Sequence, residues 1–405
     1  MRLDQTDTKR DNAALASSSV KIMLNRMSKT LLVFGWLVTA VAGALAAEPP
    51  AWLTELAEAV EGRQMVQLGE SGHGVAEFYT LKTDIVRHLH EQHGFDILAV
   101  EGGVAECWLT NRYLSDWSAR QAVQACFWDT WVGVESEALF AYLQSRRASD
   151  RPLQLVGFDN QPTSRVFQEW LAGEPDLLTS DQATQLHQAE IAFTRLFSGR
   201  VEDPAEVVEL FNQARQGFKA VEPDDDTLRT IIANRLASLD FDPAELSQET
   251  IGPMRDALMA ELLLAQAEAN PDARILVWAH NAHIAHSYSQ HVGGYKRQGE
   301  FVHERLGDRL YTLGLYSGGG RAYAWFLNEV VDLQIPEEDS LEARLLAHPG
   351  PVAFADLAKL RRSGESWVDE PTSAMEWGAW PHQIIPGDMF DGVLVVRTVS
   401  PLQRE

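Results

Sequence analysis

The chain has 405 residues, of which 45% are hydrophobic, and its formal net charge is -24 at pH 7. This hydrophobic content is enough for a sizeable core, in one large domain or two smaller ones. The excess of acidic residues argues against a nucleic-acid partner, because neutralising phosphates requires a basic surface. It also disfavours electrostatic docking on anionic lipid, and its general consequence is solubility.

The amino-terminal segment has the features of a secretory signal peptide, which we predict over residues 1–46. A polar stretch, residues 1–26, precedes an apolar run over Thr30–Ala46 that ends in a small-x-small sequence. We therefore expect cleavage near Ala46 and a secreted or periplasmic protein with no stable membrane partner afterwards. Met27 can be the true start, with the residues before it an extra extension. The alternative is an uncleaved membrane anchor, although the run is short for a span.

Neither the cysteines nor the glycines indicate a cofactor. Cys107 and Cys126 are the two cysteines of the chain, too few for a disulfide framework. One bridge between them can form in an oxidising compartment. The chain has no Cys-x-x-Cys pair that would suggest structural zinc, and Gly318–Gly320 lacks the pattern of a dinucleotide or phosphate loop. We expect no metal and no other cofactor.

Over residues 47–405, predicted strands alternate with predicted helices. This alternation is typical of right-handed βαβ units, so we expect an α/β domain with a mostly parallel central sheet flanked by helices. The expected strands are Met65–Leu68, Phe95–Val100, Leu153–Gly157, Arg274–Ala279, Tyr311–Tyr316, Val352–Asp356 and Val393–Thr398. The expected helices around the first three strands are Trp52–Glu61, Val75–His93, Val104–Trp117 and Glu135–Arg147.

The strand pattern is interrupted between the third and fourth strands. Residues 174–271 contain amphipathic helical segments separated by proline and aspartate breaks. We interpret them as a helical insertion that caps the sheet and supplies an apolar wall for a bulky substrate. Further on, the Gly-, Trp- and Pro-rich segment Ser363–Pro386 is predicted to be a long loop.

The most informative stretch is Gln67–Gly74, where a strand runs into a glycine-rich turn before a helix. Glu70 and His73 lie three residues apart in this turn, and its glycines allow a sharp bend that leaves both side chains uncovered. A carboxylate beside an imidazole can move protons near neutral pH. Glu70 and His73 are therefore our first candidate catalytic residues.

Three later strands also end in polar residues. Glu101 follows the second strand, Asp159 the third, and His280 and His283 the fourth. The carboxyl ends of parallel strands lie on one edge of a sheet, where α/β folds bind ligands. A single histidine at a strand end is more often structural, but this recurrence favours one catalytic cluster. Lys82, on the helix after the first turn, would ordinarily extend to the surface, yet its helix starts beside the cluster.

These motifs together resemble the erythromycin esterase family. The resemblance is carried by the Gly-Glu-Ser-Gly-His-Gly74 turn with Ala76-Glu-Phe after it, Gly94-Phe95, the strand ending Val-Glu101, Gly157-Phe-Asp159, and Trp278-Ala-His-Asn-Ala-His-Ile284. They occur in the family's order and spacing from about Gln67 to Thr398. The resemblance implies a hydrolase that opens an ester or macrolide lactone with water, without a covalent acyl-enzyme.

The resemblance also implies roles for individual residues. His73 is similar to the general base that activates water, while Glu70 and Glu101 are similar to the acids that orient it. His280 and His283 are similar to the histidines that face the substrate carbonyl. Lys82 departs from the family pattern, because macrolide-hydrolysing members carry arginine there, and lysine cannot reproduce the bidentate grip of a guanidinium.

The resulting hypothesis assigns catalysis to His73, Glu70, Glu101 and His280, and substrate binding to His283, Lys82 and Asp159. Hydrolysis needs a base for water and a donor for the oxyanion, which a protonated histidine or Lys82 can supply. One alternative is a metal-dependent hydrolase in which the same glutamates and histidines hold a divalent ion. Another is a non-macrolide member of the family with a binding role. The expected partner is a small ester or lactone.

Overall fold

The computed structural model describes residues 48–404, apart from residues 174, 199 and 202. The signal peptide predicted over residues 1–46 lies outside this range. Within the described part of the chain, no helix has both the length and the apolar character that crossing a membrane requires.

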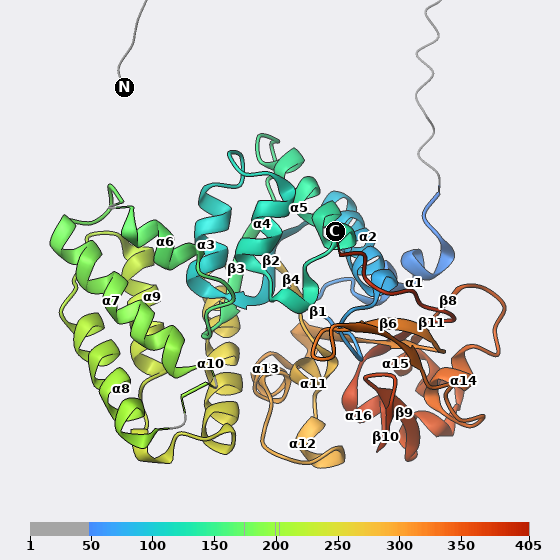
Figure 1. Cartoon of the computed structure of the whole chain (residues 1–405). Helices are drawn as coiled ribbons and strands as arrows, with labels where there is room; N and C mark the ends of the chain where they lie inside the picture. Colours follow the sequence, from blue (N-terminus) through green and yellow to red (C-terminus); the bar gives the residue numbers. More distant parts are fainter. Residues whose placement is uncertain (1–47, 174, 199, 202, 405) are drawn as a thin grey trace, which may run out of the picture. The chain divides into compact units, whose positions relative to one another are not determined.

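Seven strands form the central sheet. They are β1 (Met65–Leu68), β2 (Phe95–Gly103), β3 (Gln154–Asp159), β4 (Arg274–Trp278), β5 (Leu310–Ser317), β8 (Val352–Asp356) and β11 (Gly392–Val396). Their order is β3-β2-β4-β1-β5-β11-β8, and β8 at one edge runs antiparallel to β11 whereas the other pairs are parallel (Figure 1). The prediction of an α/β fold with a mostly parallel sheet is confirmed.

Helices cover both faces of the sheet because side chains alternate between its faces. On β2, Leu98 packs in a core cluster with Phe78 of α2, whereas its neighbour Ile97 packs with Met259 of α10. Helix α2 ends at Gly94, which has the left-handed conformation typical of a helix end (φ 75°, ψ 28°). The helices and short turns that precede β3 are α1 (Ala51–Ala59), α2 (Ala76–His93), α3 (Val104–Arg112), α4 (Ala119–Cys126), η1 (Asp129–Trp131) and α5 (Val134–Arg146).

The helices after β3 form a separate layer with its own core (Figure 1). They are α6 (Val166–Ala172), α7 (Ser180–Leu196), α8 (Pro204–Lys219) and α9 (Asp226–Ala237), with η2 (Pro243–Glu245) after them. The buried guanidinium of Arg235 ties this layer to the sheet, donating to Glu190 of α7 at 2.8 Å and to the Asn160 carbonyl at 2.6 Å. The layer begins before residue 174, and α10 (Gln248–Ala269) packs on the sheet instead.

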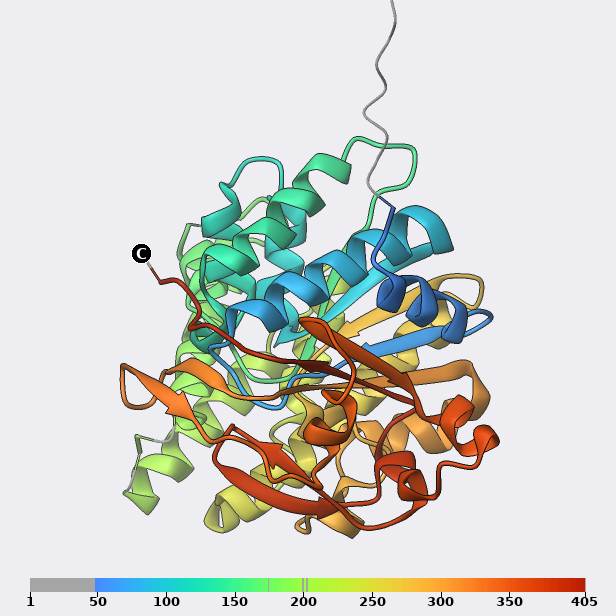
Figure 2. The same ribbon diagram turned by 90° about the vertical axis from the view of Figure 1, so that its right-hand side faces the viewer.

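The carboxy-terminal part adds two hairpins (Figure 2). They are β6 (Gly320–Ala324) with β7 (Glu329–Leu333), and β9 (Thr372–Glu376) with β10 (Trp380–Ile384). The prediction of a long loop over Ser363–Pro386 is wrong, because burial of Ala374 and Ile384 stabilises a hairpin there. The other short elements are α11 (Asn281–Ile284), α12 (Tyr288–His291), α13 (Gln298–Leu306), η3 (Gly307–Arg309), α14 (Leu341–Leu345), α15 (Leu357–Ser363), η4 (Ser366–Asp369) and α16 (Pro386–Met389).

A disulfide between Cys107 and Cys126 joins α3 to the end of α4 across 19 residues of sequence. The bridge lies beside the carboxyl end of β2, where the Cβ of any residue replacing Gly102 would come within 2.8 Å of the Cys107 sulfur. It thereby fixes the segment that leads from β2 into the helices.

Replacing both cysteines, as Cys107→Ala with Cys126→Ala, should destabilise the protein. Closing a loop of this length lowers the entropy of the unfolded chain and is worth about 3 kcal/mol. Urea unfolding should show a loss of this size, and dithiothreitol should lower the stability of the wild type but not that of the variant. Equal stability of the two proteins, with and without reductant, would contradict the prediction.

Candidate active site

Four adjacent strands bring the predicted residues to one edge of the sheet. In the order β3-β2-β4-β1, Asp159, Glu101, His280 and Glu70 stand at or just after the carboxyl ends. The backbone N–H of His280 donates to Glu101 Oε2 at 3.1 Å, and the rings of His73 and His280 lie 5.1 Å apart. The cluster that parallel pairing predicts is therefore present.

Glycine is required at two positions of the turn that carries Glu70 and His73. A Cβ at Gly69 would lie 2.0 Å from Asn281 Oδ1, so only glycine lets β1 pass this close to α11. Gly74 has a φ of 75°, and a Cβ there would lie 2.0 Å from the carbonyl oxygen of Tyr323. The turn therefore fits closely between α11, the helix that follows β4, and the β6–β7 hairpin.

The Glu70 carboxylate is fully buried, and three donors surround it. Its Oε1 lies 2.6 Å from His73 Nδ1 and accepts from Trp131 Nε1 at 2.6 Å, and its Oε2 accepts from Lys82 Nζ at 2.6 Å. Trp131 Nε1 is also 3.0 Å from His73 Nδ1, but the shorter contact to the carboxylate is the hydrogen bond. His73 thus donates from Nδ1, which leaves the Nε2 lone pair free to accept a proton.

Lys82 keeps Glu70 ionised. Burial by itself would raise the pKa of Glu70, but the Lys82 charge and the His73 hydrogen bond outweigh it and lower that pKa. Burial lowers the pKa of Lys82, with the Glu70 charge opposing the change. The ammonium also donates to the Ala279 carbonyl at 3.2 Å and lies 4.3 Å from the Trp278 ring centroid.

His280 is held as a neutral donor. Its Nδ1 accepts from the Ala282 backbone N–H at 3.1 Å, so the proton of the neutral ring is on Nε2, a buried nitrogen with no hydrogen-bond partner among the described residues. Burial lowers the pKa of His280 well below its ordinary value, and the charges of His73 and His283 add to this effect. The sequence leaves open a protonated histidine as the oxyanion donor. His280 does not match that expectation, because its ring is held neutral.

A second group of charges centres on Arg255 of α10. Its guanidinium donates from Nη2 to Asp159 Oδ2 at 2.6 Å and to Glu101 Oε1 at 2.9 Å. Asp159 also accepts from Trp128 Nε1 at 3.2 Å. Burial alone would lower the pKa of Arg255, but the Asp159 and Glu101 charges raise it. Arg255 therefore fixes Glu101, which in turn holds the backbone of His280.

His283 belongs to this group, and its Nε2 lies 3.3 Å from Arg255 Nη1. Its Nδ1 donates to Asp256 Oδ1 at 2.7 Å, and its Nε2 lies 3.4 Å from Glu101 Oε1. Burial by itself would lower the pKa of His283, but the charges of Asp256 and Glu101 raise it. Asp256 also pairs with Arg297, whose Nη1 is 3.3 Å from Asp256 Oδ2.

Two residues predicted to bind substrate, Lys82 and Asp159, are buried and paired with protein groups. The Lys82 side chain has no exposed surface and lies behind Glu70, where it supports the carboxylate and does not reach a substrate. The Asp159 carboxylate is equally buried and is taken up by Arg255 and Trp128. Both act by positioning other groups, because each is enclosed by its partners.

Sequence reasoning missed Arg255, Asp256, Trp131 and Trp377. The first two appear in the sequence as ordinary charged residues of a helix, although Asp256 shares a helical face with the buried Met259 and Leu263, which was a usable signal. Trp377 lies in the hairpin that was predicted to be a loop. Its ring stacks on His280 at 4.7 Å and meets His73 edge-on at 4.8 Å.

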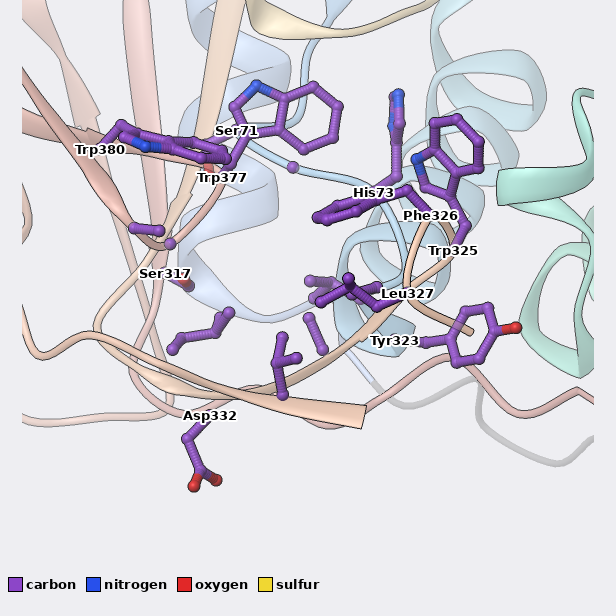
Figure 3. Close-up of a pocket in the computed structure, with 18 of the residues that line it drawn as sticks. Ser71, His73, Ser317, Tyr323, Trp325, Phe326, Leu327, Asp332, Trp377 and Trp380 are labelled. Carbon is purple, nitrogen blue, oxygen red and sulfur yellow. The ribbon is translucent and has the colours of Figure 1, made fainter. Parts of the chain in front are cut away.

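An open apolar pocket adjoins His73. It has a volume of about 280 Å³ and is lined mainly by the β6–β7 and β9–β10 hairpins. Figure 3 shows Trp377 and Trp380 on one side and Trp325 and Phe326 on the other, beside His73. The apolar wall next to the proposed base thus comes from these hairpins and not from the helical insertion expected to supply it.

The buried oxygens of the cluster are committed to protein donors. Within the described residues, no group of three or more histidine, cysteine, aspartate or glutamate side chains has a spacing suited to a metal ion. Glu70 is surrounded by His73, Lys82 and Trp131, and Glu101 by Arg255 and the His280 backbone.

The fold and the site define an α/β protein whose histidine–carboxylate cluster lies at the carboxyl edge of a parallel sheet. The erythromycin esterase family model matches residues 90–399. The chain therefore belongs to the erythromycin esterase family, and this membership supports a hydrolase of the ester or macrolide type.

Individual relatives agree with this assignment. The Bacillus subtilis (strain 168) protein named "Putative hydrolase YbfO" is 24% identical over 383 residues, which cover 85% of this chain and 86% of that protein. Erythromycin esterase type I of Escherichia coli is 25% identical over 267 residues, covering 56% of this chain and 64% of the relative. A solved structure of an erythromycin esterase mutant in its open conformation superposes with a TM-score of 0.60 at 18% identity, covering 86% of this chain and 94% of that chain, and shows the same fold.

Removing the counter-ion of Glu70 should be costly. Lys82→Met leaves an unpaired buried carboxylate, so the free energy of unfolding should fall by roughly 3–5 kcal/mol. The matched control is Glu70→Gln combined with Lys82→Met, which removes both charges and should recover most of that loss. Urea unfolding measures both variants. A double variant no more stable than Lys82→Met would show that the pairing is not what stabilises this position.

The His283–Asp256 pair predicts a stability difference that depends on pH. The raised pKa of His283 adds stability that is complete below the ordinary value of 6.5 and is lost as pH rises through the folded value. Burial alone would raise the pKa of Asp256, but His283 lowers it from 3.8 to about 2, so that contribution is complete above 3.8 and is lost toward pH 2.

Asp256→Asn should remove both contributions. The stability difference between wild type and variant should therefore be largest between about pH 4 and 6.5 and smaller at pH 3 and pH 9. Urea unfolding across this range measures it. A difference that does not change with pH would contradict the pairing of the two charges.

Proposed function

We propose that this protein hydrolyses a carboxylic ester or lactone with water activated by His73 and without a covalent acyl-enzyme. The observation that carries the proposal is the pairing of His73 Nδ1 with the buried Glu70 carboxylate at 2.6 Å. This contact orients the ring and leaves Nε2 as the acceptor. Membership of the erythromycin esterase family supports the same reaction class.

In the first step, His73 Nε2 takes a proton from water while the water oxygen attacks the carbonyl carbon of the substrate. The developing imidazolium is stabilised by the Glu70 carboxylate, which stays ionised because Lys82 faces its other oxygen. The oxyanion accepts a hydrogen bond from His280 Nε2–H, the buried donor that has no partner among the described residues.

In the second step, the tetrahedral intermediate collapses and the bond to the leaving alkoxide breaks. The His73 imidazolium returns its proton to that oxygen, so the products are an alcohol and a carboxylic acid, which then ionises. For a lactone, both groups remain in one opened molecule. Glu101 and Arg255 act indirectly here, since they hold the His280 backbone and give the oxyanion donor a fixed position.

We also propose that the protein works outside the cytoplasm. The described disulfide between Cys107 and Cys126 supports an oxidising compartment, where such bridges persist. This agrees with the signal peptide expected over residues 1–46, from which secretion or export to a periplasm would follow.

His73→Asn should lower kcat for ester hydrolysis by roughly 10²–10⁴-fold, because the substitution removes the general base without adding a charge. Hydrolysis in H₂¹⁸O should place the label in the released carboxylate, with no labelled or acylated protein detected by mass spectrometry. The matched control is His348→Asn, at an exposed histidine away from the cluster, which should hydrolyse as fast as the wild type.

Three results would contradict the mechanism. His73→Asn with wild-type kcat would remove His73 as the base. A trapped acyl-protein would show a covalent intermediate. Loss of activity after treatment with a chelator, restored by zinc or manganese, would show that the metal-dependent alternative is correct.

A further inference from the structure

The pocket beside His73 is built by two hairpins that the catalytic proposal does not use. The turn of the β6–β7 hairpin contributes Trp325, Phe326 and Leu327, and the β9–β10 hairpin contributes Trp377 and Trp380. Its volume of about 280 Å³ exceeds the roughly 150 Å³ cavity that binds a benzene molecule. It lies just below the roughly 300–1,000 Å³ of pockets that hold drug-sized ligands.

The side chains around this pocket are unusually exposed for their size. The exposed fractions of Trp325, Phe326, Leu327 and Trp380 are 51%, 59%, 53% and 54%. Contiguous exposed apolar surface of this kind marks an interaction site. The pocket carries little charge, because the carboxylate of its acidic residue, Asp332, points away from the aromatic side chains (Figure 3).

The backbone of Trp377 is held in a conformation that this residue type rarely adopts. Its φ is 56°, in the left-handed region that favours glycine and asparagine. A hydrogen bond from its N–H to the Ser71 carbonyl at 2.6 Å keeps it there. Such strain persists where the surrounding structure requires it, typically at functional sites. Here it places the indole against both His73 and His280.

The pocket is continuous with the proposed catalytic site. Ser71, Gly72 and His73, all from the turn after β1, form part of its lining. A group bound between the hairpins therefore lies next to the ring that activates water.

We propose that this pocket binds one uncharged, apolar group of the ester, an alkyl chain or a single aromatic ring, and so selects the substrate. The inference rests on the proposed hydrolysis and deepens it. A lipid surface would meet the same exposed side chains, but the net charge of -24 disfavours anionic membranes, and the pocket leads inward to His73.

The test compares esters of different chain length in a pH-stat, using ethyl acetate, ethyl octanoate and octyl acetate. For the wild type, kcat/KM should be higher for at least one of the two long isomers, ethyl octanoate or octyl acetate, than for ethyl acetate. The isomer with the higher kcat/KM is then used to test the variants. Trp325→Ala and Phe326→Ala should each lower kcat/KM for that isomer at least tenfold more than for ethyl acetate. Val330→Ala is the matched control, on the same hairpin and 42% exposed but outside the pocket lining, and should keep the wild-type preference.

A binding measurement separates this inference from the catalytic proposal. N-ethyloctanamide, an uncleaved analogue, should bind His73→Asn by calorimetry and bind at least tenfold more weakly when Trp325→Ala is added. If no ester is hydrolysed but this difference is found, the pocket assignment stands and the proposed reaction fails. Equal kcat/KM losses for long and short esters, or no loss, would overturn the pocket assignment. The pocket assignment would also be overturned if Trp325→Ala and Phe326→Ala lowered only the binding to phosphatidylcholine vesicles, because the exposed side chains would then dock on lipid.

Discussion

A carboxylate with no exposed surface, that of Glu70, is the group on which the site depends. Burying a charge costs several kcal/mol unless donors and an opposite charge surround it. Lys82 reaches Glu70 from α2, Trp131 from η1, and His73 from the turn itself. Three segments must therefore pack against the end of β1 before the charge of Glu70 is compensated. The orientation and tautomer of the His73 ring are consequently fixed only in the completed fold.

Local sequence was sufficient to predict the frame of this arrangement. Short apolar runs that alternate with helical periods specify a parallel sheet, and the parallel direction alone places the residues after β1, β2, β3 and β4 on one edge. Helix α2 ends at His93, as in the expected helix Val75–His93, and Gly94 follows it in the left-handed conformation. The approximate gathering of Glu70, Glu101 and His280 followed from these rules without any knowledge of side-chain contacts.

What the sequence could not predict depends on long-range packing. Arg255 reaches Glu101 across 154 residues, and nothing in an amphipathic helix distinguishes a surface arginine from one that enters a site. Lys82 illustrates the opposite case, because a lysine near a core-facing stripe normally extends to solvent. Here a buried carboxylate at the same depth holds it inside. The hairpin that carries Trp377 was hidden by its Gly, Trp and Pro content, which is typical of loops.

The ionic groups of the site balance one another, although the chain as a whole is strongly acidic. Lys82 pairs with Glu70, Arg255 with Asp159 and Glu101, and Arg297 with Asp256, beside which His283 also lies. Each of these carboxylates therefore has a cationic partner, and long-range attraction contributes little to the capture of an uncharged ligand. Association with an uncharged molecule should accordingly be almost indifferent to ionic strength, with shape and water release setting the affinity.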